Sequence, residues 1–501
     1  MVRDRTSTWL LVVAAVLGLA GASYLAAAGT VLGRALPDDH LWFFGGWSQL
    51  DPANLGRHPA IALNFTALGV WAVAWLLAGL AVRRGASWRA LMLVGGLWAL
   101  PLLVVPPLFS PDMYAYTAIG ASVHHGVDPY LNGPGAAGDI PAVRGSEPFW
   151  RFSPTPYSPP YIVLLSVLSR IFDEHMLMVL VALRVVAVAS WGVLAVLTKK
   201  LAERFGVNPA FAFWLGIVNP LVLINGVSAG HNDITMMAFL VPGILLALKD
   251  RPLWGVLLCA LGGGVKVTAL VAVAVIGIEY ARRQQGRLAQ FKALVLSGAV
   301  GGGAFVVISE LSGYGWGWIH NLNFPGRAVV PLSPMAALAV TIDPAQPPLD
   351  KVRSIGVVAG GVVCLLLLTR LRRWGLVRVM AWVLLTVTAV GPVVWPWYLI
   401  APVMLFAIAG RPQEIVFSVL CSIGVLFTTF PGGEPTLGYL GWPRAFELML
   451  GLFGLLLVWA AVNDAITRHR HEQREEREQE ALGQRDSSTG LGARTEVSAG
   501  T

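Results

Sequence analysis

The sequence is poor in charged residues. Of its 501 residues, 13% are Asp, Glu, Lys or Arg, whereas an ordinary soluble domain carries roughly a quarter. Hydrophobic residues make up 56% of the chain, and the mean hydropathy is +0.66. Because so few charged side chains could not cover the surface of a soluble protein of this length, the composition excludes an ordinary soluble enzyme.

Cysteine is also scarce, and familiar cofactor motifs are missing. The three cysteines, Cys259, Cys364 and Cys421, lie in apolar stretches and show neither disulfide nor metal-site spacing. The chain has no Walker A lysine loop, no HExxH and no CxxC, so nothing indicates ATP hydrolysis or a zinc centre. We predict no cofactor, although the carboxylates leave a divalent metal open.

The net charge of +8 does not indicate nucleic-acid binding, because of where the charge lies. Lys and Arg occur in short clusters between apolar stretches, such as Arg83-Arg84 and Lys199-Lys200. This placement is typical of the cytoplasmic loops of a membrane protein. We therefore expect no nucleic-acid partner, a multi-pass protein in the cytoplasmic membrane, and cytoplasmic N- and C-termini.

Apolar stretches long enough to cross a bilayer recur along the chain, beginning at residues 10–28 and 60–82. They predict an all-α polytopic membrane protein with about 12–14 transmembrane helices, at about 20 residues per crossing. The stretch 253–281 is flanked by basic residues and interrupted by glycines and Lys266, which predicts a broken hairpin that either crosses or re-enters. The short apolar segment 161–172 favours an interfacial helix. The charged, Gln-rich and then Ser/Thr/Gly-rich tail from 464 to 501 predicts disorder.

The longest polar segments, residues 110–160 and 312–348, are predicted to face outward, and loops this long are commonly functional. The first begins Ser-Pro-Asp112-Met-Tyr114-Ala-Tyr116, directly after a predicted span. A carboxylate at this position could deprotonate a hydroxyl nucleophile. It could equally be the N-cap of the following helix, and spacing alone favours the cap.

Four further segments carry candidate substrate-binding residues. Asp128 and Tyr130 lie in a Pro/Gly-rich stretch that alone indicates only a turn. His231 and Asp233, at an outer turn, could bind a phosphate or a sugar hydroxyl or could simply shape the turn. Lys266 could meet a phosphate at helix ends or a structural carboxylate.

Aromatic residues also allow two readings. Trp395 and Trp397 could form a stacking platform for a sugar, or could belong to an interfacial aromatic belt, as most of the 19 tryptophans should. The cluster Asp38-Asp39-His40 is a further candidate for a base or a metal ligand, although a solvated loop explains it as well.

Taken together, these segments resemble the actinobacterial polyprenol-phosphate-mannose-dependent α-1,6-mannosyltransferases, which elongate the mannan core of lipomannan and lipoarabinomannan and have the GT-C fold. Between about residues 90 and 400 the chain carries, in the family's order, the segments Ser-Pro-Asp112-Met-Tyr-Ala-Tyr, Gly-Val-Asp128-Pro-Tyr-Leu-Asn-Gly-Pro, Thr-Pro-Tyr-Ser-Pro, Gly-His231-Asn-Asp, Val-Lys266-Val-Thr-Ala and Trp-Pro-Trp397-Tyr-Leu.

The resemblance implies a GT-C core at residues 89–463, with residues 1–88 as additional helices. It implies transfer of mannose from polyprenyl phosphomannose to a mannan or lipoglycan acceptor on the outer face of the cytoplasmic membrane, with inversion. Asp112 matches the family's base. Lys266, with His231 or Arg327, would hold the departing phosphate by charge-assisted contacts.

Other functions stay open at this point. A transferase of another polyprenyl-phosphate sugar, such as arabinose, would show the same pattern. A transporter or flippase should show paired inverted halves with matched broken helices, and the sequence indicates a single broken hairpin. A non-catalytic assembly protein would leave the long aromatic-rich outer loops unexplained.

Overall fold

The computed structural model describes residues 5–32, 56–433, 435–436, 441, 443–455, 458–459, 462 and 466. Contacts divide the chain into two compact units, Met1–Glu447 and Leu448–Thr501, and the account below concerns the first. Every regular element in the described part is a helix, so the all-α polytopic prediction is confirmed. The cluster Asp38-Asp39-His40 and most of the predicted tail lie outside the described residues.

Five described helices are long and apolar enough to cross a membrane. They are α1 (Arg5–Leu32), α2 (Arg57–Arg83), α8 (Met176–Arg204), α13 (Arg287–Ser312) and α16 (Leu349–Thr369). Shorter apolar helices include α3 (Trp88–Leu103), α7 (Pro159–Ile171) and α20 (Pro412–Gly424). The segment predicted to be an interfacial helix is thus a separate short helix, α7.

The remaining apolar segments form three bent or hairpin-like pairs of short helices. The first joins α9 (Pro209–Gly216) through a π-helix (Val222–Ser228) to α10 (Asn232–Leu248), with a bend of 103° between the π-helix and α10. The second joins α11 (Pro252–Val265) to α12 (Leu270–Arg282), and the third joins α18 (Leu376–Val390) to α19 (Ile400–Ala409).

Two of these helix pairs, α11–α12 and α18–α19, begin and end at the same end of the bundle, as an ion pair across each of them shows. Arg283, just after α12, contacts Asp250, just before α11, at 3.1 Å. Arg378, near the start of α18, contacts Glu414, just after α19, at 2.6 Å. Each of these helices has 10 to 15 residues and is too short to cross a bilayer core of about 30 Å alone. The segment 253–281 is therefore a hairpin of two short helices, and whether it re-enters or crosses stays a prediction.

The three glycines of this hairpin lie in the last turns of α11, not at its tip. The tip itself is Lys266 and the short 3₁₀ turn Val267–Ala269. A side chain at Gly263 would come within 2.4 Å of Leu270, and one at Gly264 within 3.1 Å of Pro160. The glycines are needed because neighbouring segments pack directly against the helix backbone.

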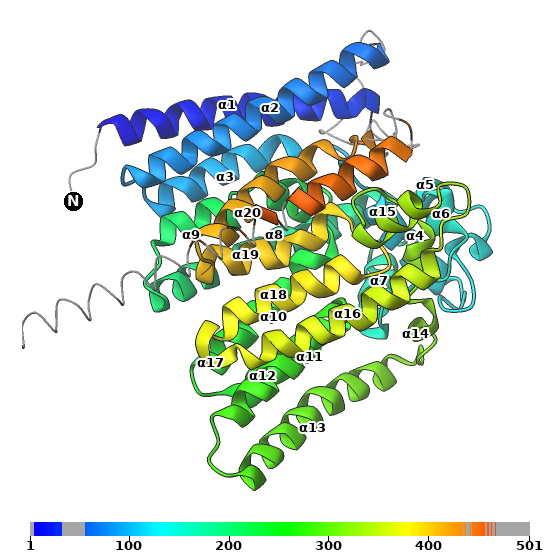
Figure 1. Cartoon of the computed structure of the whole chain (residues 1–501). Coiled ribbons are helices and arrows are strands. Elements are labelled where there is room, and N and C mark those ends of the chain that lie inside the picture. The colour runs from blue at the N-terminus through cyan, green and yellow to red at the C-terminus, as the bar shows by residue number, and fades with distance from the viewer. Residues whose placement is uncertain are drawn as a thin grey trace, which may run out of the picture. The chain divides into compact units, whose positions relative to one another are not determined.

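The predicted outer loops fold into short helices that gather at one end of the bundle (Figure 1). They are α4 (Asp112–His124), α5 (Pro141–Gly145), α6 (Pro148–Arg151), α14 (Trp318–Asn321) and α15 (Pro334–Ile342). The short helix α17 (Leu371–Trp374) and the turn between α12 and α13 lie at the opposite end. The bundle therefore has one end rich in loops and another of short basic turns.

The helix α2 packs against the rest of the bundle through tryptophans. Trp75 stacks on Trp214 of α9 with ring centroids 4.8 Å apart, and each indole N–H donates to the other residue's carbonyl, at 2.9 and 2.7 Å. Trp71 meets Trp98 of α3 edge to face at 6.2 Å. Buried aromatic contacts thus join α2 to α3 and α9, while the predicted boundary at residue 88 stays a prediction.

Candidate functional site

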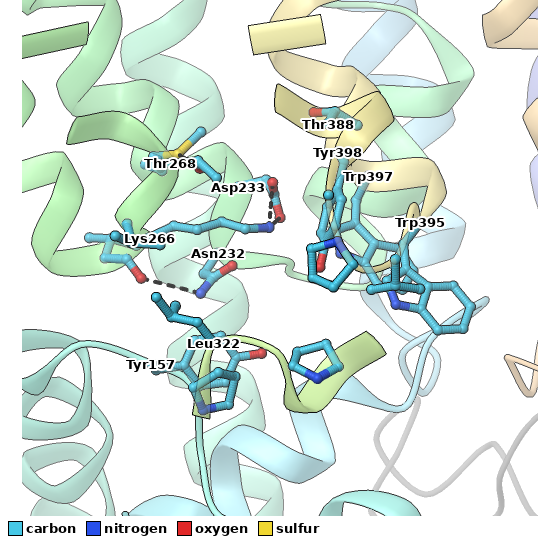
Figure 2. A pocket seen from close by; sticks show the side chains of 18 of the residues that line it. Tyr157, Asn232, Asp233, Lys266, Thr268, Leu322, Thr388, Trp395, Trp397 and Tyr398 are labelled. Atoms are coloured by element: carbon cyan, nitrogen blue, oxygen red, sulfur yellow. Dashed lines mark hydrogen bonds and ion pairs between the residues drawn. The ribbon is translucent and has the colours of Figure 1, made fainter. Parts of the chain in front are cut away.

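A cavity of about 260 Å³ lies where the tips of the short helices meet the loops of one end. Its wall is formed by the start of α4, the segment before α7, the start of α10, the tip between α11 and α12, the end of α18 and the turn before α19. Figure 2 shows side chains from several of these segments, among them Asp233, Lys266 and Trp397, converging from separate helices. Segments up to 289 residues apart in sequence, from Asp112 to Ala401, contribute to one wall.

Asp112 lies on this wall as the first residue of α4. The N-cap is Pro111, so the alternative that Asp112 is the N-cap is wrong. The backbone N–H of Asp112 donates to the Ser110 hydroxyl at 3.2 Å. The side chain is buried, with 6% of the residue exposed.

His231 is an ionisable neighbour of this carboxylate. Its Nδ1 lies 3.4 Å from Oδ2 of Asp112. The imidazole is fully buried and stacks on the indole of Trp397, with ring centroids 3.6 Å apart and planes 16° apart. Trp397 in turn stacks on Trp395 at 5.3 Å. The two tryptophans and the histidine thus form one continuous stack of rings beside Asp112.

Asp233, two residues after His231, contacts a different partner. Both of its carboxylate oxygens lie 2.7 Å from Nζ of Lys266 (Figure 2). The same ammonium group lies 3.9 Å from the centroid of the Tyr398 ring, within the range of a cation–π contact. The ion pair is the structural alternative considered for this lysine, and the contact with the Tyr398 ring was not predicted.

Hydrogen bonds fix the tip that carries Lys266. The hydroxyl of Ser158, just before α7, donates to the carbonyls of Gly263 and Gly264 at 3.1 and 2.8 Å. The amide of Asn232 donates to the carbonyl of Val265 at 3.4 Å. These bonds satisfy carbonyls at the end of α11 that have no partner within the helix.

A cluster of three tyrosines lies at the cavity wall, and two of them line it. Tyr116 lines the wall and meets Tyr157 and Tyr161 edge to face, with ring centroids 5.5 and 5.4 Å away. Burial, and then the charge of Asp112, raise the pKa of the Tyr157 phenol well above its usual value. Tyr157 therefore stays neutral and can donate a hydrogen bond near the carboxylate.

The structure places five predicted site residues outside the cavity lining, namely Tyr114, Asp128, Tyr130, Arg327 and the His231 described above. Tyr114 is buried within the bundle. Asp128 accepts the backbone N–H groups of Tyr130 and Leu131 at 2.8 and 3.3 Å, which is the turn geometry that its segment indicated. Tyr130 donates its hydroxyl to the Tyr157 carbonyl at 3.1 Å. Arg327 lies over the ring of Phe324 at 4.0 Å.

Sequence reasoning missed other lining residues, including Trp150, Tyr157, Asn232, Asn323, Thr388 and Tyr398. Asn232 and Tyr398 adjoin predicted residues, so their motifs could have identified them. Nothing in the sequence distinguishes Trp150 from the other tryptophans. Its loop reaches the cavity because the amide of Asn321 donates to the carbonyls of Tyr130 and Thr155, at 3.0 and 3.2 Å, and so joins the two outer loops.

The wall therefore offers a carboxylate beside a buried imidazole, a lysine–carboxylate pair and several aromatic faces. Such a set can remove a proton from a hydroxyl, compensate an anionic group and stack on a sugar. Among the described side chains, no group of three or more His, Cys, Asp or Glu residues could hold a metal ion.

Comparison with known proteins identifies the chemistry of this family. Residues 15–282 match the model described as the N-terminal domain of alpha-(1->6)-mannopyranosyltransferase, and residues 330–463 match the C-terminal domain of MptB. The first match alone spans more than half of the chain and includes α2 and most of α1.

Curated relatives carry the same name. The chain is 28% identical to alpha-(1->6)-mannopyranosyltransferase A of Mycobacterium tuberculosis over 80% of this chain and 81% of the relative. It is 29% identical to a probable alpha-(1->6)-mannopyranosyltransferase of Mycolicibacterium smegmatis over 76% and 77%. It is 30% identical to alpha-(1->6)-mannopyranosyltransferase A of Corynebacterium glutamicum over 46% of this chain and 51% of the relative.

No solved structure matches the chain. The two family matches and the curated relatives agree with the resemblance that the motifs indicate. The chain belongs to the alpha-(1->6)-mannopyranosyltransferase family and is a membrane-embedded mannosyltransferase.

Proposed function

We propose that this enzyme transfers mannose from polyprenyl phosphomannose to an α-1,6-mannan acceptor of the lipomannan or lipoarabinomannan type, on the outer face of the cytoplasmic membrane. The observation that carries the proposal is the placement of Asp112 at the wall of a cavity that also holds a lysine and two stacked tryptophans. The cavity lies among helices with apolar outer faces, where a lipid-linked donor can reach it from the bilayer.

In the proposed reaction Asp112 is the base. Its carboxylate takes the proton of the acceptor 6-hydroxyl, and that oxygen forms a bond to the anomeric carbon of mannose. The bond from the anomeric carbon to the phosphate oxygen breaks, and its electron pair leaves with polyprenyl phosphate. Attack opposite to the leaving group inverts the β-linked donor to an α-linked product.

Lys266 is the proposed partner of the departing phosphate. Because its ammonium group contacts both oxygens of Asp233, a phosphate must share this lysine or replace one of its contacts. Charge-assisted contacts of this kind stabilise the negative charge that develops on the leaving group. Trp395 and Trp397 offer apolar ring surface at the same wall for a sugar.

The test is mannose transfer in isolated membranes, with labelled polyprenyl phosphomannose and a short α-1,6-mannoside acceptor. We expect wild type to extend the acceptor and Asp112→Asn to lose roughly 10²–10⁴-fold in rate, the usual contribution of a positioned base. The matched control is Asp139→Asn, which removes an exposed carboxylate of the same outer loop and should leave the rate unchanged.

The possible outcomes separate the parts of the proposal. Full activity of Asp112→Asn, at equal protein level, would refute the assignment of the base. A wild type that is inactive with this donor but active with another lipid-linked sugar would refute the choice of donor and keep the reaction class.

A further inference from the structure

We infer that His231 is a positioning residue for Asp112. Nδ1 of His231 holds Oδ2 of the carboxylate, so that Oδ1 faces the acceptor hydroxyl. The inference rests on the proposed role of Asp112 as base. It assigns His231 a place behind the carboxylate, in contrast to a contact with the phosphate of the donor.

The first argument is burial. None of the surface of His231 is exposed, and the residue does not line the cavity, whereas Asp112 and Trp397 both do. A group that contacts the donor phosphate must present a nitrogen to the cavity. His231 instead lies behind the two residues that do line it.

The second argument is the geometry of the pair. Nδ1 of His231 lies 3.4 Å from Oδ2 of Asp112, slightly longer than a hydrogen bond between these atoms. Contacts in a catalytic site are often long before substrate binds and shorten in the reacting complex. Among the described residues no side chain donates to Oδ1, so this oxygen is the one available to the acceptor.

The third argument is the stack that fixes the plane of the imidazole. The ring lies 3.6 Å from the centre of the Trp397 ring system and nearly parallel to it. Neither ring nitrogen has a hydrogen bond within the described part of the chain. The orientation of Nδ1 therefore depends on packing against Trp397, and the carboxylate is the polar group within its reach.

The fourth argument is the backbone conformation directly before His231. Gly230, directly before His231, has φ +59°, a conformation that glycine adopts readily, and a Cβ there would come within 2.6 Å of the Met113 sulfur. A π-helix, Val222–Ser228, precedes this turn, and such insertions often occur at functional sites. The turn sends His231 toward Asp112 and Asp233 toward Lys266.

Two amide variants test the inference, because Asn places its side-chain nitrogen near Nδ1 of histidine and Gln places its nitrogen near Nε2. We expect His231→Asn to keep a rate within about tenfold of wild type, and His231→Gln to lose about 10²-fold in kcat, as a misplaced catalytic group does. The KM for polyprenyl phosphomannose should stay unchanged in both.

The reverse order, or a donor KM that rises while kcat is unchanged, would show that His231 binds donor and would overturn the inference. These outcomes require an active wild type, so they differ from failure of the proposed function, in which wild type transfers no mannose. Protein level and thermal unfolding of each variant are measured in parallel. Should both variants fail to fold, Trp397→Tyr keeps a ring over the imidazole and Trp397→Leu removes it. The inference then requires a lower kcat in Trp397→Leu, and equal kcat would overturn it.

Discussion

Among the described residues that line the cavity, the carboxyl and amino side chains are Asp112, Asp233 and Lys266, so carboxylates outnumber ammonium groups. On the proposed function, a phosphate donor would add further negative charge to this wall. Asp233 and Lys266 are both largely buried, with side chains 5% and 14% exposed. Their pair therefore stabilises each charge in the absence of substrate and also competes with phosphate for the lysine.

Removing one partner of such a pair leaves the other charge buried without compensation, which costs about 3–5 kcal/mol. We expect Lys266→Met to lower the melting temperature and to abolish transfer. The double variant Asp233→Asn/Lys266→Met should regain much of the melting temperature without regaining transfer, as measured by thermal unfolding in detergent and by mannose transfer. A double variant as active as wild type would mean that the pair only stabilises the fold.

The sequence predicted single residues of the site unevenly, and helix geometry explains why. Tyr114 and Tyr116 are two positions apart on α4, and side chains at that spacing point in nearly opposite directions around a helix. Tyr116 therefore lines the cavity and Tyr114 does not. To predict which of the two tyrosines lines the cavity, one must know that the helix begins at Asp112. The sequence did not decide whether Asp112 is the N-cap or lies in the first turn.

At the scale of elements, the sequence predicted the α11–α12 hairpin because Lys266 and three glycines interrupt an apolar stretch flanked by basic residues at both ends. It did not predict the α18–α19 pair as a hairpin. Its two helices have 15 and 10 residues, and apolar composition alone does not distinguish two half-length helices from two crossings. The ion pair between Arg378 and Glu414 shows the return, and sequence pattern cannot show a contact between helices.

The turn before α10 offers a test at this scale. Gly206 and Gly230 both have positive φ, +66° and +59°, but a Cβ at Gly206 meets nothing within 4 Å, whereas one at Gly230 meets the sulfur of Met113. We expect Gly206→Ala to cost about 1 kcal/mol of stability, the penalty of left-handed backbone, and to leave kcat unchanged.

Gly230→Ala should cost more stability and also lower kcat, because the displaced Met113 adjoins Asp112. Thermal unfolding and transfer assays measure the two effects separately. Equal kcat for the two alanine variants would show that the position of Met113 does not affect the carboxylate.

At the scale of the bundle, we propose that the loop-rich end lies outside the cell and the basic turns lie in the cytoplasm. Asp139 and Asp250 are exposed markers of the two ends, with side chains 79% and 88% exposed. In a variant whose three native cysteines are replaced by alanine, Asp139→Cys should react with a membrane-impermeant maleimide on intact cells. Asp250→Cys should react only after permeabilisation, and labelling of both on intact cells would contradict this orientation.

The helices that return to their starting side also pack against one another below the cavity. Beneath the tips, α10, α11, α12 and α19 bury apolar side chains against one another, among them Met237, Val256, Val275 and Phe406. On the proposed function, a sugar bound at the tips would enter and leave on the same side of this packed layer. On the proposed function we therefore expect the enzyme to change the molecule to which mannose is bonded and not the compartment in which mannose resides, so that a separate protein would carry the lipid-linked donor across the bilayer.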